Sequence, residues 1–473
     1  MLSLADVFEA LIGIRPDWTS QVITATCIDS RRVVPGAMFV ALSGERVDGH
    51  DYVSDAFSRG AKVAIIQRDL SALFAVTDLS SKEEQVVLPP EEEHFCILVE
   101  DSLKALQQIA RFYRRRFSLR VIGITGSVGK STTKEVVAEV LSQRYRTLKN
   151  PGNLNNEIGL PLTLLSLRER HQTAILEMGF YVPGEIAFLC DLALPQVGVI
   201  TNIGTVHAER AGSQEAIARG KAELVQALPP APDGTAILNY DDARVRNMAE
   251  QTRARVFFYG LSPEADLWAD EVEGLGLDGI RFRLHYRNET LHLRVPLIGR
   301  HSVHTALRAS AVGLVEGLSW QEIVGGLRSG RAQLRLVAVR SETGATLLDD
   351  TYNASPQSTF AALNLLEELE GNKIAVLGDM LELGPYEWQG HEMVGVRTAE
   401  VAHELITVGN RGRMIAAAAH RAGMKGDLIT EFEDCQQVID YLQPKLGPSD
   451  VVLVKGSHGM RMDRIVAALE YHR

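Results

Sequence analysis

The residue types that can do chemistry are concentrated between Val121 and Thr133, where the chain reads Val-Ile-Gly-Ile-Thr-Gly-Ser-Val-Gly-Lys-Ser-Thr-Thr. Glycines let a backbone curl until its N–H groups point at a phosphate, and the N-terminus of a following helix adds partial positive charge. Lys130 can reach the terminal phosphates of a nucleoside triphosphate, and the Ser131 hydroxyl can bind Mg²⁺. The stretch therefore predicts a loop that binds a nucleoside triphosphate.

A phosphate-binding loop of this kind needs a strand before it and a helix after it. The apolar run over residues 121–124 predicts the strand, and the run over residues 134–141 predicts the helix. The plainer alternative is an ordinary strand-to-helix turn that carries Gly-Lys-Ser by chance. The presence of both flanking patterns favours the phosphate loop.

Two further polar residues follow predicted strands of the same region. Glu177 ends an apolar run over residues 173–177, and His207 comes soon after a second run over residues 197–200. Ligands of open parallel sheets bind at the carboxyl ends of strands. A carboxylate there suits Mg²⁺, which prefers oxygen ligands, whereas an imidazole is a less usual partner. The alternatives are a surface salt bridge for Glu177 and a hydrogen-bonded loop histidine for His207.

Composition describes an ordinary soluble globular enzyme. The 473 residues are 45% apolar, and the formal net charge is −11 with an isoelectric point near 5.7. That acidic balance argues against broad nucleic-acid binding, which needs a basic surface. A local basic cluster, Arg111 to Arg116, is expected to form a solvated helix face.

Cysteine usage and the absence of targeting signals indicate a cytoplasmic protein. None of the four cysteines is spaced as CxxC, so we expect reduced, mostly structural thiols. No signal peptide opens the chain, and no apolar run approaches the roughly 20 residues needed to span a bilayer.

The order of helical and apolar runs predicts an α/β protein of three domains. Residues 1–99 form a small N-terminal α/β module that ends in an acidic, proline-bearing loop, at residues 80–93. Residues 100–331 alternate helices with apolar strands, which indicates a central, mostly parallel sheet with an antiparallel hairpin at residues 281–295. The alternation restarts over residues 332–473, which predicts a smaller, doubly wound, Rossmann-like C-terminal domain.

Several short motifs, in order along nearly the whole chain, resemble those of the Mur ligases, the ATP-dependent enzymes that build the peptidoglycan stem peptide. They are Asp29-Ser-Arg31, Pro35 to Gly44, Asp48 to Asp51, Thr125 to Thr132, Gly152 to Asn156, Glu177-Met-Gly179, Thr201 to His207, Asp349 to Pro356, Val376 to Gly384 and Leu453 to Ser457. Each motif alone is moderately specific, and together they are strong. They most resemble the branch of the family that adds D-alanyl-D-alanine to UDP-N-acetylmuramoyl-tripeptide.

The resemblance implies both a division of labour and a mechanism. The N-terminal domain would bind the UDP-sugar, the central domain ATP, and the C-terminal domain part of the ATP site and the incoming dipeptide. The tripeptide carboxylate would attack the γ-phosphate of ATP, and the amine of D-alanyl-D-alanine would attack the resulting acyl phosphate. A cytoplasmic monomer with about two Mg²⁺ ions is expected.

Lys221 lies in a helical run where most Mur ligases carry a carbamylated lysine. A carbamate would turn this cation into an anion that could help to hold a second Mg²⁺, and its formation requires the neutral amine. The alternative is a plain lysine on the surface of a helix.

The resemblance implies roles for further residues. The catalytic set would be Lys130, His207, Lys221 and Arg335, and the metal ligands would be Ser131, Glu177, His207 and a modified Lys221. ATP would contact Thr125, Gly126, Ser127, Gly129, Lys130, Ser131, Thr132, His301, Arg335 and Asp350. The substrates would contact Ser30 and Arg31 at the UDP group, Asn155 and Asn156 near the reacting carboxylate, and Tyr352, Asn353 and Lys455 on the dipeptide side.

Three positions depart from the family pattern. Ser302 and Thr305 stand where the adenine-binding helix usually has asparagines, and Ser355 replaces another asparagine. A hydroxyl cannot make the paired donor and acceptor contacts of an amide, so adenine binding is expected to differ. The alternatives are the diamino-acid-adding Mur ligase, whose Asp-Asn-Pro-Arg signature is missing, and a non-catalytic P-loop nucleotide-binding protein.

Overall fold

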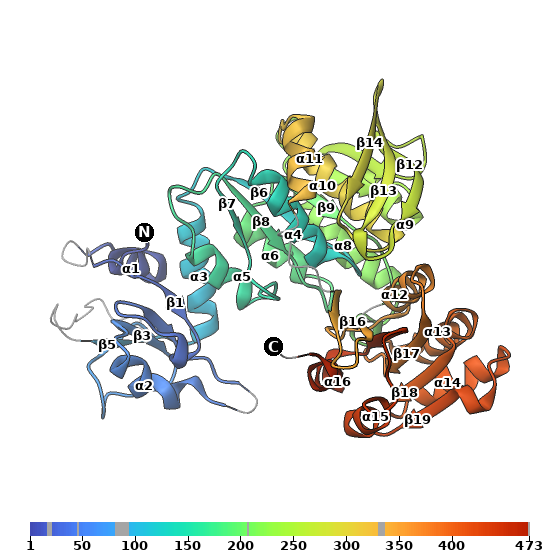
Figure 1. Ribbon diagram of the computed structural model, residues 1–473. Helices are drawn as coiled ribbons and strands as arrows, with labels where there is room; N and C mark the ends of the chain where they lie inside the picture. Colours follow the sequence, from blue (N-terminus) through green and yellow to red (C-terminus); the bar gives the residue numbers. More distant parts are fainter. Residues whose placement is uncertain (17–20, 45–46, 81–93, 206–207, 330–335, 472–473) are drawn as a thin grey trace. The chain divides into compact units, whose positions relative to one another are not determined.

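A computed structural model describes residues 1–473 apart from 17–20, 45–46, 81–93, 206–207, 330–335 and 472–473 (Figure 1). The chain divides into two compact units. The first unit comprises residues 1–123, 145–179 and 187–196, and the second unit comprises residues 124–144, 180–186 and 197–473. Most of the predicted acidic loop at residues 80–93 lies outside the described residues.

The N-terminal strands form a five-stranded parallel sheet in the order β1-β2-β3-β5-β4. Helix α1 begins with a capping box, in which Ser3 and Asp6 satisfy each other's backbone N–H groups. The elements of this region are α1 (Leu4–Ile12), β1 (Thr26–Cys27), β2 (Met38–Val40), α2 (Val53–Ser58), β3 (Val63–Ile66), β4 (Val76–Asp78), β5 (Phe95–Leu98) and α3 (Ser102–Arg114).

One part of the prediction for this region is wrong. The cluster from Arg111 to Arg116 is not a uniformly solvated helix face, because Arg114 is only 3% exposed. Its Nε donates to the carbonyl of Ala193 at 2.7 Å and its Nη1 to that of Phe117 at 2.8 Å. These carbonyls need a buried donor, which outweighs the preference of a charged group for water.

The central sheet has nine strands in the order β14-β13-β12-β11-β10-β9-β6-β8-β7. The predicted hairpin is confirmed, since β13 and β14 pair in antiparallel register. Strand β12 also pairs with β13 in antiparallel register. The strands are β6 (Arg120–Thr125), β7 (Thr147–Lys149), β8 (Thr173–Glu177), β9 (Val197–Ile200), β10 (Thr235–Asn239), β11 (Arg255–Gly260), β12 (Leu267–Gly274), β13 (Ile280–Tyr286) and β14 (Glu289–Val295).

Along the chain, helices alternate with many of these strands, because neighbouring parallel strands need a long crossover connection, which is usually a helix. They are α4 (Lys130–Leu141), α5 (Gly159–Leu165), α6 (Glu185–Ala193), α7 (Ala208–Ala211), α8 (Gln214–Gln226), α9 (Ala243–Arg246), α10 (Val303–Val315) and α11 (Trp320–Arg328). Helix α4 begins four residues earlier than predicted, directly behind the left-handed Gly129.

The C-terminal sheet has six strands in the order β15-β16-β20-β17-β18-β19, all parallel except for the pairing of β15 with β16. Its elements are β15 (Val337–Arg340), β16 (Thr346–Asp350), α12 (Pro356–Glu368), β17 (Asn372–Gly378), α13 (Glu387–Val401), β18 (Glu404–Val408), α14 (Gly412–Arg421), β19 (Ile429–Phe432), α15 (Cys435–Leu442), β20 (Asp450–Lys455) and α16 (Asp463–Leu469).

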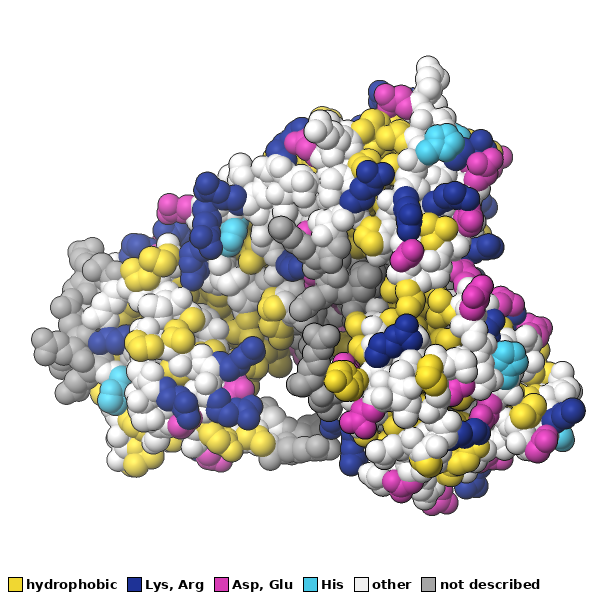
Figure 2. Space-filling view, viewed as in Figure 1, with side chains coloured by type: hydrophobic (Ala, Val, Ile, Leu, Met, Phe, Trp, Pro, Cys, Tyr) yellow, Lys and Arg dark blue, Asp and Glu magenta, His cyan; other side chains and the backbone are white. Residues whose placement is uncertain are grey.

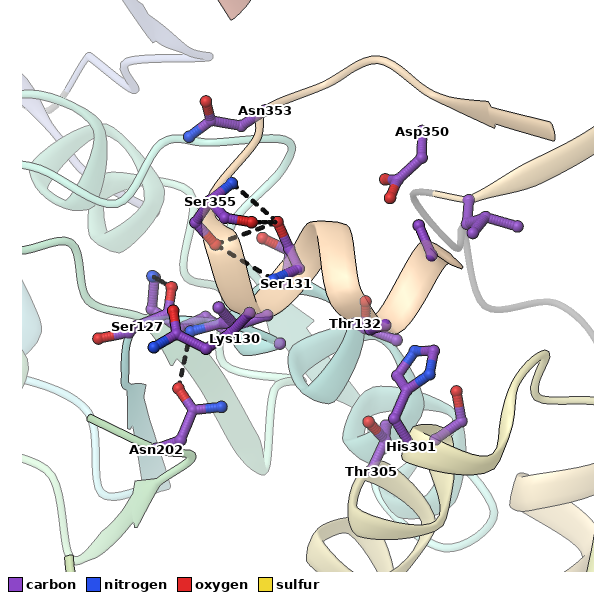
Figure 3. A pocket seen from close by; sticks show the side chains of 18 of the residues that line it. Ser127, Lys130, Ser131, Thr132, Asn202, His301, Thr305, Asp350, Asn353 and Ser355 are labelled. Carbon is purple, nitrogen blue, oxygen red and sulfur yellow. Dashed lines mark hydrogen bonds between the residues drawn. The ribbon is translucent and has the colours of Figure 1, made fainter. Parts of the chain in front are cut away.

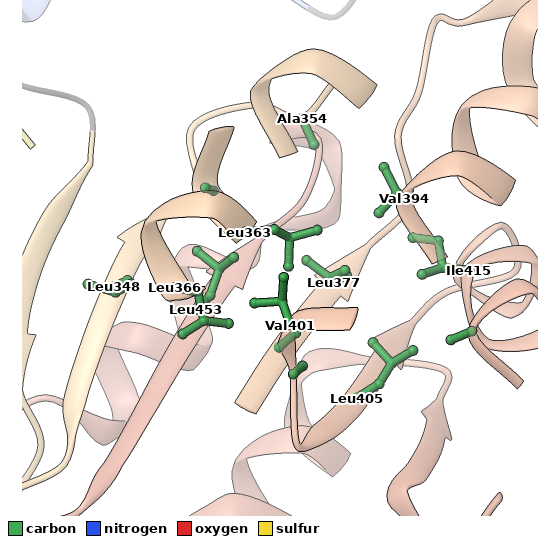
Figure 4. Close-up of a cluster of buried hydrophobic side chains, with 14 of the residues drawn as sticks. Leu348, Ala354, Leu363, Leu366, Leu377, Val394, Val401, Leu405, Ile415 and Leu453 are labelled. Carbon is green, nitrogen blue, oxygen red and sulfur yellow. The ribbon is translucent and has the colours of Figure 1, made fainter. Parts of the chain in front are cut away.

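Alternate strand residues of this sheet face two separate apolar cores. Leu348 and Leu453 pack against α12, α13 and α14 (Figure 4), whereas their neighbours Leu347 and Val452 pack against α15 and α16. A sheet buried on both faces in this way is doubly wound. The predicted α/β architecture with a Rossmann-like C-terminal sheet is therefore confirmed, while the domain limits at residues 99 and 331 stay predictions.

The surface view agrees with the mixed composition. On the face drawn in Figure 2, Lys and Arg side chains lie interspersed with Asp and Glu side chains. The four cysteines are buried and make no disulfide, as expected: Cys27, Cys96, Cys190 and Cys435. No helix within the described ranges is long and apolar enough to cross a membrane.

Candidate functional site: a phosphate-binding loop facing the C-terminal sheet

The predicted phosphate loop connects β6 to α4 in the second unit. Two of its glycines are required by geometry: Gly126 has a φ of 144° and Gly129 a φ of 84°. A Cβ at Gly126 would also overlap the Thr201 hydroxyl, so no larger residue fits. Gly129 ends the loop in left-handed backbone and is the N-cap residue of α4, which starts at Lys130.

The segment after β9 fixes the shape of this loop. The backbone N–H of Ser127 donates to the Asn202 carbonyl at 3.0 Å, and that of Val128 donates to Asn202 Oδ1 at 2.9 Å. The Thr201 hydroxyl donates to the Val128 carbonyl at 2.7 Å. Thr201 and Asn202, which follow β9, therefore preorganise the loop, and the Asn202 side chain is labelled in Figure 3.

Two lysines converge on the first glycine of this loop. Lys130 Nζ donates to the Gly126 carbonyl at 2.7 Å, and Lys221 Nζ, from α8, donates to the same carbonyl at 3.1 Å. Lys221 is fully buried, and its ammonium group lies 4.8 Å from the centroid of the Phe180 ring. Burial, together with the charge of Lys130, lowers the pKa of Lys221 well below its usual value. The alternative of a surface lysine is wrong.

The loop opens into a cavity of about 340 Å³ that lies within the second unit. Three regions line it: the phosphate loop with the start of α4, the start of α10, and the segment after β16 (Figure 3). The residues that line the cavity and were predicted as site residues are Ser127, Gly129, Lys130, Ser131, Thr132, His301, Asp350, Tyr352, Asn353 and Lys455. Thr125 and Gly126 belong to the same loop but are buried behind this surface.

The C-terminal side of the cavity is organised by one buried ion pair. Lys455, at the end of β20, is 2% exposed, and its Nζ lies 2.6 Å from Asp350 Oδ2, at the end of the neighbouring β16. Lys455 also donates to the Asn353 carbonyl at 2.9 Å. The pair thus holds both the Asp350 carboxylate and the turn that carries Tyr352 beside the cavity.

The start of α10 supplies the residues at which the sequence departs from the family. The Ser302 hydroxyl donates to the Ile298 carbonyl at 2.6 Å, and the Thr305 hydroxyl accepts from Arg308 at 2.9 Å. Burial, followed by the nearby charge of His304, lowers the pKa of His301 to about 4. His301 is therefore a neutral imidazole at pH 7.

The third departure, Ser355, has a local structural role. It is the N-cap residue of α12, where its hydroxyl accepts from the backbone N–H of Ser358 at 3.3 Å. The Ser358 hydroxyl in turn accepts from the backbone N–H of Ser355 at 3.0 Å, which completes a capping box. An asparagine can cap a helix as well, so the substitution keeps the element in place.

A separate polar group forms in the first unit around Glu177, the last residue of β8. The Glu177 side chain is fully buried, which rules out the surface salt bridge. Asn155 Nδ2 donates to Glu177 Oε1 at 2.8 Å, and Asn150 bonds both backbone groups of Glu177. Asn156 instead accepts from the backbone N–H of Gly159 at 2.9 Å, near the start of α5.

The N-terminal candidates also lie in the first unit. Ser30 is buried at the start of a short 3₁₀ turn, whereas the Arg31 side chain is 81% exposed. Asp29 accepts two hydrogen bonds from the Arg31 guanidinium, at 2.9 and 2.8 Å. Arg31 therefore presents a partly neutralised cation to the solvent.

Some candidates cannot be placed, and some cavity residues escaped prediction. His207 and Arg335 lie outside the described residues. Arg308 and Gln357 line the cavity without having been predicted, because a helical arginine or glutamine carries no motif of its own. Within the described ranges no three His, Cys, Asp or Glu side chains gather as a preformed metal site.

A preorganised glycine loop, a helix N-terminus and a cationic cavity beside parallel strands together define a P-loop nucleotide-binding α/β protein. The description "Mur ligase middle domain" matches residues 124–313, "Mur ligase, glutamate ligase domain" matches residues 331–458, and "Mur ligase family, catalytic domain" matches residues 22–114. The chain belongs to the Mur ligase family, whose members are ATP-dependent ligases that form amide bonds.

Full-length relatives agree with this assignment. The chain is 35% identical over 472 residues to the UDP-N-acetylmuramoyl-tripeptide–D-alanyl-D-alanine ligase of Bacillus subtilis, covering 99% of this chain and 97% of that protein. It is similar to a crystal structure of MurF from Acinetobacter baumannii, with a TM-score of 0.82, 31% identity and coverage of 98% and 97%. MurF from Thermotoga maritima, solved with ADP, gives a TM-score of 0.76 at 27% identity, with coverage of 94% and 96%.

Proposed function

We propose that this protein joins D-alanyl-D-alanine to UDP-N-acetylmuramoyl-tripeptide at the expense of ATP, in the synthesis of peptidoglycan precursors. The observation that carries the proposal is the cavity in which the phosphate loop faces Asp350, Tyr352 and Lys455. A nucleotide bound at Lys130 would lie in the same cavity as Asp350, which is assigned to its adenosine part, and as Tyr352 and Lys455, which are assigned to the dipeptide. The full-length similarity to ligases of this name supports the choice of substrates.

The chemistry requires two displacements. A carboxylate oxygen of the tripeptide attacks the γ-phosphorus, the bond to the β,γ-bridging oxygen breaks, and ADP leaves. The dipeptide amine then attacks the acyl carbon, and phosphate leaves as the amide forms and the amine loses its proton. Lys130 and the N-terminus of α4 offset the repulsion between the carboxylate and the triphosphate.

The residues present fit Mg²⁺ held mainly by nucleotide oxygens. Ser131, at the start of α4, supplies a hydroxyl of the kind that binds Mg²⁺ in phosphate loops, and Glu177 supplies a buried carboxylate. Mg²⁺ normally takes only one or two protein carboxylates, so the lack of a preformed acidic cluster in the described ranges does not oppose this assignment. Bound Mg²⁺ would neutralise charge on the phosphates.

We assign Lys221 to a carbamate that serves as a further anionic ligand. Its pKa is lowered by burial and by Lys130, which favours the neutral amine, the form that reacts with CO₂. The negative charge that forms would remove the repulsion from Lys130. His207, which is not described, remains a proposed ligand, and Arg335 a proposed contact of the γ-phosphate.

The other substrate contacts remain as expected from the family. Ser30 and Arg31 are assigned to the UDP group, Asn155 and Asn156 to the end of the tripeptide, and the Tyr352–Asn353 turn with Lys455 to the dipeptide side. His301 and Asp350 are assigned to the adenosine part of ATP. An enzyme that consumes ATP and a UDP-linked substrate would work in the cytoplasm, and we assign it as a monomer.

The experiment is a phosphate-release assay with amide product detection, in which each substrate is omitted in turn. The proposed ligase releases phosphate rapidly only with the muramoyl tripeptide and D-alanyl-D-alanine both present. Lys130→Ala and Glu177→Ala should each abolish product, whereas Lys104→Ala, at a lysine that is 81% exposed, should not change the rate. Amide product from a diamino acid and the UDP-N-acetylmuramoyl-dipeptide would favour the preceding ligase. Phosphate release that does not depend on either substrate would favour a nucleotide switch.

A further inference from the structure

Arg308, in α10, is a buried arginine in the wall of the nucleotide cavity. It is 4% exposed, and no carboxylate among the described residues pairs with it. Its Nη2 donates to Thr305 Oγ1 at 2.9 Å and its Nη1 to the Tyr259 hydroxyl at 3.4 Å, both of which are neutral groups. Its Nε is buried and has no hydrogen-bond partner in the part of the chain that the structure describes.

An arrangement of this kind is costly unless an anion completes it. A guanidinium does not lose its proton in proteins, so Arg308 cannot escape the penalty of burial by becoming neutral. A buried arginine is normally satisfied, as Arg114 is by two backbone carbonyls. Arg308 instead keeps an unused donor at the wall of a cavity that binds an anionic ligand.

The position of Arg308 identifies the part of the ligand that it would meet. A Cβ built on Gly129 would lie 3.2 Å from Arg308 Nη2, so the guanidinium faces the end of the phosphate loop. Thr132, in the first turn of α4, lines the same cavity. The backbone of a phosphate loop at this point cradles the α- and β-phosphates, whereas its lysine reaches the β- and γ-phosphates.

We propose that Arg308 binds the α- and β-phosphates of the nucleotide, as a second cation beside Lys130. This inference rests on the proposed nucleotide-dependent function and adds a residue to that site. A guanidinium can donate two parallel hydrogen bonds to phosphate oxygens, which a lysine cannot do. Thr305, which stands at a position where the family usually has asparagine, would then have a role of its own. Its hydroxyl accepts a hydrogen bond from Arg308 and so orients the guanidinium, whereas the asparagine would contact the adenine base.

The test compares Arg308→Met, which keeps an unbranched apolar stem but removes the guanidinium and its charge, with the wild-type full chain. Affinities for ADP, AMP and adenosine are measured by competition against a fluorescent ADP analogue. We expect ADP to bind at least about tenfold more weakly to the variant, AMP to lose less, and adenosine to be unchanged. Arg308→Lys should recover part of the loss, because it restores charge without the bidentate geometry.

Melting temperatures separate this role from a merely structural one. Without nucleotide, Arg308→Met should melt at the same temperature as the wild type or higher, because an unpaired buried charge has been removed. The rise on adding ADP should shrink. The matched control is Arg114→Met, which strands two buried carbonyls: it should melt lower and bind ADP as the wild type does.

Two outcomes would overturn the assignment. Arg308→Met that binds ADP with unchanged affinity would show that the phosphates do not need it. A variant that melts lower and loses adenosine as strongly as ADP would make Arg308 a structural residue. Wild-type protein that binds no ADP would remove the proposed function as well, which distinguishes that failure from a failure of the assignment alone.

Discussion

Two lysines of the second unit, both almost completely removed from solvent, are treated in opposite ways by their surroundings. Lys455, at the end of β20, has the Asp350 carboxylate 2.6 Å away and is fixed by a carbonyl as well. Lys221, in α8, has one carbonyl at 3.1 Å and an aromatic ring, and no carboxylate among the described residues pairs with it. The like charge of Lys130 acts with burial to lower its pKa.

The difference separates a cation that shapes the site from an amine that can react in it. A buried ammonium group beside a carboxylate stays charged and holds its partner in place. A buried ammonium group beside another cation is driven toward the neutral form, which is the nucleophilic form of lysine. Burial alone therefore does not indicate a role, and the charge of the neighbours decides it.

The largest expected effect is the loss of ligase activity in Lys221→Met. If a carbamate on Lys221 stabilises metal-bound phosphate charge, its removal should lower kcat by roughly 100- to 1,000-fold, the scale of several kcal/mol of electrostatic stabilisation. In CO₂-free buffer, where the amine is unmodified, the melting temperature should not fall, because a buried amine that pairs with no carboxylate among the described residues has been replaced by an apolar side chain. Steady-state kinetics and differential scanning calorimetry measure the two quantities.

The modification itself has a direct readout. With isotopically labelled bicarbonate, the wild type should show a carbamate carbon resonance that is absent from Lys221→Met but kept in Lys455→Met. Acetate or propionate should restore part of the activity of Lys221→Ala by supplying a carboxylate. Full activity in Lys221→Met, or a carbamate signal that survives the substitution, would contradict the assigned role.

Breaking the Lys455–Asp350 pair should have the opposite effect on stability and lower the melting temperature. Lys455→Met leaves Asp350 without its buried partner, and breaking one side of a buried pair costs about 3 to 5 kcal/mol. Because Asp350 is 15% exposed, we expect the lower end of that range. A melting temperature lower by several degrees, measured by calorimetry, would confirm the effect.

The double variant Lys455→Met/Asp350→Leu sharpens this result. It removes both charges together, so it should regain much of the lost stability while nucleotide binding stays impaired. If the double variant is no more stable than Lys455→Met, the ion pair is not what organises the turn at Asn353. Asp350→Asn alone should resemble Lys455→Met, because it strands the ammonium group instead of the carboxylate.

The sequence predicted the fold well, because the apolar runs are long and the phosphate loop fixes their order. The strand at residues 235–239 appears with the predicted bounds. What the apolar pattern missed was either short and partly exposed, as in β15 and β19, or set by backbone conformation, as in the early start of α4 behind Gly129. Periodicity reports burial, and it carries little information where a strand lies at a sheet edge.

The candidate site was predictable only where a motif contains the functional residue. The structure gathers Lys130, Ser131, His301, Asp350 and Lys455 around one cavity, although up to 325 positions separate them. His207 and Arg335 are outside the described residues, so their positions relative to this cavity stay predictions. Arg308 could not be predicted, because its proposed role follows from the finding that no carboxylate among the described residues pairs with it. A sequence does not show which residues are neighbours in space.

The smallest effect, and the finest test of the comparison, is a pH dependence. The pKa of Lys221 is lowered in the folded protein, and its usual value is near 10.5. Between those two values the unfolded chain binds a proton that the folded protein does not, so this group makes stability rise with pH, by about 1.4 kcal/mol per pH unit. Lys221→Met removes that contribution. In CO₂-free buffer, the melting temperature of the variant should therefore exceed that of the wild type most at the low end of the window, and the difference should shrink as the pH approaches 10. Parallel curves for the two proteins would mean that Lys221 stays protonated when folded, and its difference from Lys455 would then vanish.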